Sequence, residues 1–132
     1  MTVRPLILVV EDEYFLQADV VQALGRAGFE TDAVFSGEEA LGLFASGTRP
    51  YKALITDIRL GGSMSGWEVA RQIREKDDGF PVIYLTASAI EEWASEGVPN
   101  GILIAKPFVT AQLVTKLASL LTVSAEAGAI KS

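Results

Sequence analysis

The sequence predicts an α/β fold in which helices cover both faces of a doubly wound, parallel, five-stranded sheet. Three observations support this prediction. Five short apolar runs alternate with segments that carry apolar residues at helical spacing. The connections between them are short and contain Gly, Pro, Ser, Asn or Asp. Most of the runs are almost continuously apolar, which is typical of strands buried on both faces of a parallel sheet.

The composition is that of one globular domain. The chain has 132 residues, of which 49% are hydrophobic and 21% charged, with a formal net charge of −6. This charge argues against a nucleic-acid-binding surface. Cysteine and histidine are both absent, which excludes disulfides, thiolate metal sites and a histidine general base. A metal would therefore be held by oxygen, which favours magnesium, manganese or calcium. The sequence has no signal-peptide pattern and no membrane-spanning run, so we expect a cytoplasmic protein.

The first predicted strand is residues 6–10, and it ends on the three carboxylates of residues 11–13. A helix follows directly, because apolar residues recur on one face, namely Leu16, Val20, Leu24 and Ala27. Gly25 and Gly28 mark its end. The mixed segment 29–35 predicts a less buried second strand.

Ser36 and Glu39 form a capping-box pattern that predicts the start of the second helix, which we expect to end near residues 46–47. The third strand is the apolar run 53–57, which stops on Asp57. A flexible loop, 61–66, precedes a helix that starts at Trp67.

The fourth strand, 81–85, ends on Thr86, and Ser88 with Glu91 predicts a second capping box for a short helix. The fifth strand, 102–105, ends on Lys106. Three leucines line one face of the last helix, at positions Leu113, Leu117 and Leu120. We expect a domain over 1–122 and a short disordered C-terminal tail over 123–132.

Polar groups stand at equivalent places in this pattern. Strands one, three, four and five end on Glu11-Asp12-Glu13, Asp57, Thr86 and Lys106. Each has an ordinary structural explanation when taken alone, as a helix cap, a turn residue or a surface amine. Those explanations do not predict that all four groups occur at the carboxyl ends of parallel strands, where ligands bind.

Such a cluster can perform phosphoryl chemistry. Converging carboxylates form a hard-oxygen site for a hydrated divalent ion. A carboxylate can also accept a phosphoryl group to form an acyl phosphate. The metal, the Lys106 ammonium and the Thr86 hydroxyl would surround the phosphoryl oxygens, and the small Ala87 would leave access for a donor.

The chain resembles the receiver domains of two-component response regulators. The resemblance covers about residues 6–121 and rests on Leu8–Glu13, Asp57, Ser65-Gly66, Leu85-Thr86-Ala87 and Lys106-Pro107-Phe108. It implies a flavodoxin-like (βα)5 fold with Asp57 as phosphoacceptor. It further implies a Mg²⁺ site made by Glu11, Asp12, Asp57 and the main-chain carbonyl of Arg59. Thr86, Ala87 and Lys106 would contact the phosphoryl group or switch with it, and the Lys106–Pro107 bond would be cis.

The resemblance implies a signalling switch and not an enzyme in the usual sense. A histidine kinase or histidine phosphotransfer protein would phosphorylate Asp57, and the shape change would alter binding of an unidentified protein target. We expect a monomer or weak dimer that contacts neither nucleic acid nor membrane directly. Two alternatives remain open, a pseudo-receiver that binds partners without phosphorylation and an aspartyl-phosphate phosphatase. A flavodoxin is disfavoured because the acidic first loop cannot cradle a phosphate.

Several positions depart from the family pattern. Leu103 stands where the family usually has a switching aromatic. The loop after Asp57 is one residue longer, and the short segment between Thr86 and Lys106 predicts a truncated fourth helix. We expect signalling to use that helix and that loop instead. Arg59 and Ser88 occupy the positions that tune phosphoryl lifetime, and neither suits the orienting of water, so we expect slow dephosphorylation. Trp67 is expected to pack, and a partner surface is expected at Trp93, Val114 and Leu121.

Overall fold

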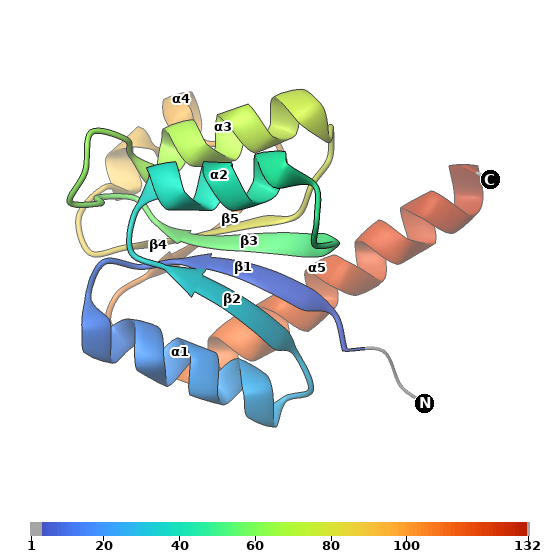
Figure 1. The fold of residues 1–132 in the computed structure, drawn as a ribbon, viewed down its shortest axis with the longest axis horizontal. Helices are drawn as coiled ribbons and strands as arrows, with labels where there is room; N and C mark the ends of the chain where they lie inside the picture. The colour runs from blue at the N-terminus through green and yellow to red at the C-terminus, as the bar shows by residue number, and fades with distance from the viewer. Residues whose placement is uncertain (1–3, 132) are drawn as a thin grey trace.

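The computed structural model describes residues 4–131, and it describes the side chains of residues 4–122. The strands are β1 (Leu6–Val10), β2 (Glu30–Val34), β3 (Tyr51–Asp57), β4 (Val82–Thr86) and β5 (Ile102–Ala105). The helices are α1 (Tyr14–Arg26), α2 (Gly37–Ser46), α3 (Gly66–Lys76), the 3₁₀ turn η1 (Ile90–Glu92), α4 (Trp93–Glu96) and α5 (Thr110–Lys131). Figure 1 shows their arrangement around the central sheet.

The sheet has the strand order β2-β1-β3-β4-β5, and every neighbouring pair is parallel. The predicted doubly wound fold is therefore confirmed. The chain passes from β1 outward to β2 and then crosses to β3 on the other side of β1. The strand order reverses between β1 and β3, and in open α/β sheets such a reversal opens a crevice at the carboxyl ends of the strands.

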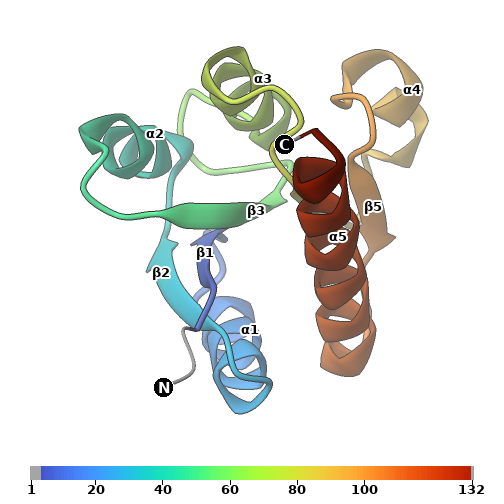
Figure 2. The same cartoon turned by 90° about the vertical axis from the view of Figure 1, so that its right-hand side faces the viewer.

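Two hydrophobic cores lie on opposite faces of the sheet. Alternate residues of β1 face opposite sides, so Leu6, Leu8 and Val10 join one core while Ile7 and Val9 join the other. Helices α2 and α3 cover the first core, and α1 and α5 cover the second (Figures 1 and 2). Figure 2 shows α4 beside α3 on the first side, above β5. Burial on both faces fixes the register of the strands and hence the position of the residues that follow them.

Two helix starts are capped as their sequences suggest. The Ser36 hydroxyl oxygen accepts the N–H of Glu39 at 3.2 Å and donates to the Glu39 carboxylate at 3.1 Å, so the first predicted capping box is confirmed in its main contact. Ser65 caps α3 by accepting the N–H of Glu68 at 3.3 Å. Gly47 ends α2 in a left-handed conformation, with φ of 66°, which glycine adopts without strain.

The second predicted capping box is wrong. The turn η1 begins after Ala89, and no side chain caps it. Instead, the Thr86 hydroxyl oxygen accepts the N–H groups of Ser88 at 3.1 Å and Ala89 at 2.8 Å. The Ser-x-x-Glu spacing is present, but the Thr86 side chain at the end of β4 already satisfies the N–H groups at the start of this segment. The truncated fourth helix is confirmed, because η1 has 3 residues and α4 has 4.

The last helix packs against the sheet through two fully buried leucines, Leu113 and Leu117. Val114 and Leu121 are partly buried against the same core, so packing explains much of the apolar stripe that we expected to face a partner. A disordered tail was expected at 123–132, but the backbone continues as helix α5 to Lys131; the side chains beyond residue 122 lie outside those described. Across residues 4–131, no helix combines the length and apolar character that crossing a membrane requires.

Candidate functional site

The carboxyl edge of the sheet brings together side chains from four strands. Glu11 follows β1, Asp57 ends β3, Thr86 ends β4 and Lys106 follows β5. Neighbouring strands are paired up to this edge, with Val10 opposite Thr56 and Asp57 opposite Leu85. These residues therefore lie around the crevice between β1 and β3 that the reversal in strand order creates.

Three carboxylates form an acidic cluster in this crevice. One carboxylate oxygen from each of Glu11, Asp12 and Asp57 lies within 4.8 Å of the others. Glu11 is fully buried and Asp57 is 7% exposed, whereas Asp12 is exposed. Burial of two like charges so close together is unfavourable unless positive charge offsets it.

Lys106 supplies positive charge to the cluster. Its ammonium nitrogen donates to Glu11 Oε1 and to Asp57 Oδ2, both at 3.1 Å. The other oxygen of Asp57 accepts the N–H of Ile58 at 2.8 Å, and the other oxygen of Glu11 accepts the N–H of Glu13 at 2.9 Å. Both buried carboxylates are thus held in fixed orientations by one shared cation and by backbone donors.

Burial dominates the electrostatics of the cluster. The pKa of Glu11 is raised to about 7: burial is the largest cause and the nearby Asp57 carboxylate adds to it, while the Glu13 N–H and Lys106 oppose the shift. Burial also lowers the pKa of Lys106, but the hydrogen bond to Glu11 and the charge of Asp57 outweigh it, so the net shift is upward. The Lys106 side chain therefore remains a cation at neutral pH.

Thr86 lies beside the cluster, and its hydroxyl oxygen is engaged by the following loop. The side chain is 1% exposed, and its oxygen accepts the two N–H groups of Ser88 and Ala89. The Thr86 carbonyl accepts the Lys106 N–H at 2.7 Å, which holds the ends of β4 and β5 together. Ser88 is exposed and contributes its backbone N–H to this contact.

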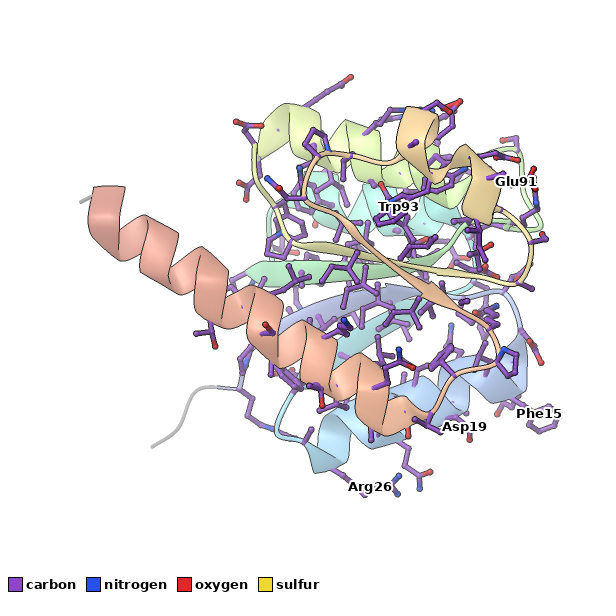
Figure 3. The ribbon with its side chains drawn as sticks, turned by 180° about the vertical axis from the view of Figure 1, so that it is seen from behind. Phe15, Asp19, Arg26, Glu91 and Trp93 are labelled. Carbon is purple, nitrogen blue, oxygen red and sulfur yellow. The ribbon has the colours of Figure 1, made fainter. Side chains whose placement is uncertain are left out.

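A cleft of about 380 Å³ adjoins the site on the α1 side. Ala87 and Lys106 line it, together with residues from the start of α1 and from the segment after β5, which are Glu13, Phe15, Leu16, Asp19, Pro107 and Phe108. Figure 3 shows Phe15 and Asp19 on α1 at this side of the molecule, with Phe15 projecting outward. The Lys106–Pro107 peptide bond is cis, as the resemblance implies.

The loop after Asp57 is tied on both sides. The Arg59 guanidinium donates to the Glu92 carboxylate at 2.8 Å, and the Ser63 hydroxyl donates to the Glu38 carboxylate at 2.9 Å. Gly61 lies close to Asp12, since a Cβ at Gly61 would be 3.4 Å from Asp12 Oδ2. The loop therefore crosses the mouth of the acidic cluster while it is held by η1 and by α2.

Leu103 occupies β5 opposite Tyr84 of β4 and is partly buried against the first core. The fully buried Tyr84 packs against Trp67 with ring centroids 4.6 Å apart, and its hydroxyl oxygen accepts the Val98 N–H at 3.1 Å. Trp67 is 4% exposed, so the prediction that it packs is confirmed. An aromatic pair is thus present in the first core, next to the position where Leu103 replaces the expected ring.

Two features of the site escaped the sequence analysis. Glu92 bonds both Arg59 and the Trp67 indole N–H, although 33 and 25 residues separate it from them. No local pattern indicates such contacts. An exposed aromatic cluster at the start of α1 was also missed: Tyr14 stacks on Phe35 with centroids 6.4 Å apart and meets Phe15 edge-to-face at 5.4 Å. The apolar residues that follow Glu13 were a visible signal for this cluster.

The fold and this set of residues define a known class of signalling domain. The family model described as the response regulator receiver domain matches residues 7–118. The chain therefore belongs to the response regulator receiver domain family of two-component systems.

Individual relatives agree with this assignment. The chain is 32% identical over 117 residues to the transcriptional regulatory protein CusR of Escherichia coli, an alignment that covers 87% of this chain and 50% of CusR. It is 34% identical over 117 residues to the two-component response regulator PhoP of Pseudomonas aeruginosa, covering 87% of this chain and 51% of PhoP. The chain thus spans about half the length of these curated relatives.

Solved structures show the same fold. A response regulator receiver protein from Sinorhizobium medicae has a TM-score of 0.86 and 40% identity, covering 90% of this chain and 95% of that one. The receiver domain of the sensor histidine kinase PA1611 from Pseudomonas aeruginosa, with magnesium coordinated in its active site cleft, has a TM-score of 0.76 and 26% identity, covering 91% and 99%.

Proposed function

We propose that this chain is a phosphoryl-accepting signalling switch in which Asp57 takes a phosphoryl group from a phosphohistidine donor. The observation that carries the proposal is the contact of Lys106 with Asp57 and Glu11 inside a buried acidic cluster. A lysine from β5 that reaches the carboxylate of β3 is suited to hold charge that develops on a transferred phosphoryl group.

The proposed phosphoryl transfer needs no reactant other than the phosphohistidine donor and a proton from water. A carboxylate oxygen of Asp57 attacks phosphorus, and the phosphorus–nitrogen bond of the donor breaks. The electron pair of that bond goes to the imidazole nitrogen of the donor, which leaves as neutral histidine after taking up a proton. The Ile58 N–H holds Asp57 Oδ1, and the Lys106 ammonium stands 3.1 Å from Oδ2, ready to contact a phosphoryl oxygen.

The residues present fit a magnesium ion. Asp12 has an exposed carboxylate close to Asp57, and three carboxylate oxygens converge within 4.8 Å. Hard oxygen donors of this kind, with room for water, suit Mg²⁺. Asp12, Asp57, Glu11 and the Arg59 carbonyl would hold the ion, which would neutralise negative charge on the phosphoryl oxygens. The similar PA1611 receiver structure, which contains magnesium in its active site cleft, supports this proposal.

The output would be a change in protein contacts. The donor would be a histidine kinase or a histidine phosphotransfer protein, and the target an unidentified protein. The proposed setting is cytoplasmic, and the proposed state a monomer or weak dimer, with the receiver domain ending near residue 122. Arg59 and Ser88 present no acid or amide side chain to an attacking water, so the acyl phosphate is proposed to be long-lived. Arg59→Asn should shorten its lifetime.

A second candidate is a pseudo-receiver that binds partners without phosphorylation. Leu103 favours it, because the switching aromatic of the family is missing at this position. Intact mass spectrometry separates the two candidates. The protein would be incubated with Mg²⁺ and acetyl phosphate beside Asp57→Ala and, as a matched control, Asp19→Ala, which changes an exposed carboxylate of α1 outside the acidic cluster.

The switch proposal expects the mass of one added phosphoryl group on the parent protein and on Asp19→Ala, and none on Asp57→Ala. An unmodified parent protein favours the pseudo-receiver. An adduct on Asp57→Ala moves the acceptor to another residue.

A further inference from the structure

The carboxylate of Glu92 joins three segments that are far apart in the sequence. Its Oε1 accepts the Arg59 guanidinium at 2.8 Å, and its Oε2 accepts the Trp67 indole N–H at 3.2 Å. Arg59 lies two residues after Asp57, Trp67 lies in the first turn of α3, and Glu92 is the last residue of η1. The segment that leads into α4 is therefore bound through a single charged side chain to the loop after Asp57, residues 58–65, which we call the acceptor loop.

The start of this segment is also tied to the site. The Thr86 hydroxyl oxygen accepts the N–H groups of Ser88 and Ala89, and the Glu92 N–H donates to the Ala89 carbonyl at 3.2 Å. Residues 87–92 are consequently held at one end by a side chain from β4 and at the other by Arg59 and α3. Both attachments lie next to Asp57.

Beyond Glu92, the contacts continue through an aromatic pair. Trp67 packs on Tyr84, whose hydroxyl binds the N–H of Val98 just after α4. On the outer side the same segment exposes Ile90, 52% exposed, and Trp93, 41% exposed. Figure 3 shows Glu91 and Trp93 on this η1–α4 segment. A movement of η1 would thus change an exposed apolar surface and the environment of a buried indole together.

We propose that Glu92 couples the charge on Asp57 to the position of the η1–α4 segment through Arg59. This inference rests on the proposed phosphorylation of Asp57. An acyl phosphate carries more negative charge than a carboxylate, and Arg59 is the cation of the loop that begins next to it. Its side chain is 61% exposed and can change rotamer without leaving a packed core. When Arg59 turns toward the phosphoryl group, Glu92 loses its ion-pair partner and η1 is released from the loop.

The Arg59–Glu92 ion pair suits a conformational switch better than a contact that stabilises the fold. Exposed ion pairs contribute little to stability, so breaking one does not unfold the domain. The additional negative charge that would compete for Arg59 is present only when Asp57 is modified. The route bypasses Leu103, which has no ring to transmit a movement from β5 to the surface.

The test uses Trp67 as a reporter. In a Trp93→Phe background the indole of Trp67 is the only one in the chain. Its emission would be recorded before and after acetyl phosphate and Mg²⁺. Each shift would be divided by the phosphorylated fraction that intact mass gives, because an amide at residue 59 also shortens the proposed phosphoryl lifetime. Arg59→Gln removes the charge that is attracted to the phosphoryl group. Glu92→Gln removes the charge of the partner but keeps an oxygen that can accept the Trp67 N–H.

Arg71→Gln is the matched control. It breaks the Arg71–Glu96 ion pair, which joins α3 to α4 and matches the Arg59–Glu92 pair in its distance of 2.8 Å and in the exposure of its side chains. We expect a shift of the Trp67 emission maximum on phosphorylation of the background protein and of the Arg71→Gln variant. We expect that shift to be lost in Arg59→Gln and in Glu92→Gln. The variant that combines both substitutions should behave like either single variant.

The outcomes separate this inference from the proposed function. If all variants are phosphorylated and the shift persists in Arg59→Gln, or never appears in the background protein, the coupling through Glu92 is refuted while Asp57 remains the acceptor. Equal loss of the shift in Arg71→Gln also refutes the coupling through Glu92. The shift would then depend on contacts of α3 with this segment in general and not on the Arg59–Glu92 pair. If the background protein gains no phosphoryl mass, the proposed function fails and this inference fails with it.

Discussion

The close approach of α3 to the end of β3 makes Gly66 a sensitive test of how the acceptor is supported. A Cβ at Gly66 would collide with the Asp57 carbonyl oxygen and would lie 3.0 Å from the Asp57 carbonyl carbon and the Ile58 Cα. These atoms are backbone and cannot rotate away. The Gly66 N–H also donates to the Ile58 carbonyl at 2.8 Å, so the helix cannot withdraw without losing that bond. Overpacking of this kind costs about 1–3 kcal/mol.

We expect Gly66→Ala to lower the free energy of unfolding by that amount, which corresponds to a shift of roughly 1 M in the urea midpoint. Gly42→Ala is the matched control, because Gly42 lies inside α2 and a Cβ there meets no atom within 4 Å. In this position alanine should stabilise the protein by about 0.5–1 kcal/mol. Urea unfolding, monitored by circular dichroism, measures both changes in the free energy of unfolding. Equal stability of Gly66→Ala and the parent, with a gain in Gly42→Ala, would refute the close contact at the acceptor strand.

Substitutions at three further positions test other parts of the structure. Thr86→Val should destabilise the domain by about 1–2 kcal/mol in urea unfolding, because it leaves two backbone N–H groups without their acceptor, whereas Thr86→Ser should keep most of the stability. Lys106→Met should lower the free energy of unfolding by about 1–3 kcal/mol above pH 7, because buried Glu11 loses its cation, and by less below pH 7, where Glu11, with its pKa of about 7, binds a proton; unchanged stability above pH 7 would contradict the electrostatic account. The hydrogen bond from Arg49 lowers the pKa of Asp32, so its contribution is present above the unfolded-state pKa and disappears as pH falls through the folded-state pKa. Asp32→Asn should therefore be less stable than the parent by about 1 kcal/mol at pH 6, with a difference that vanishes toward pH 2; a constant difference would be the contrary result.

The sequence was sufficient to predict the sheet and the residues at its edge. Strands buried on both faces are mostly apolar, so polar residues such as Asp57 and Thr86 that follow an apolar run indicate where a strand ends. All strands are parallel, which brings these ends together regardless of the details of packing. The shortened fourth helix was predictable for a similar reason, since few residues separate Thr86 from Lys106.

Contacts that depend on tertiary geometry were not predictable. The Ser88–Glu91 spacing suggested a capping box, but the Thr86 hydroxyl at the end of β4 binds the N–H groups of this segment instead. Glu92 looked like an ordinary surface acid of a short helix. Its role depends on the packing of η1 against α3 and the acceptor loop, which places Arg59 and Trp67 at its two oxygens.

The central claim is that Asp57 is the residue that accepts the phosphoryl group. An acyl phosphate is reduced by borohydride to an alcohol, which converts an aspartate into homoserine, so peptide mass spectrometry after reduction identifies the modified residue directly. We predict homoserine at position 57 in protein treated with Mg²⁺ and acetyl phosphate, and none in protein kept without the donor. Homoserine at Asp12, or unmodified aspartate throughout the acidic cluster, would contradict the account.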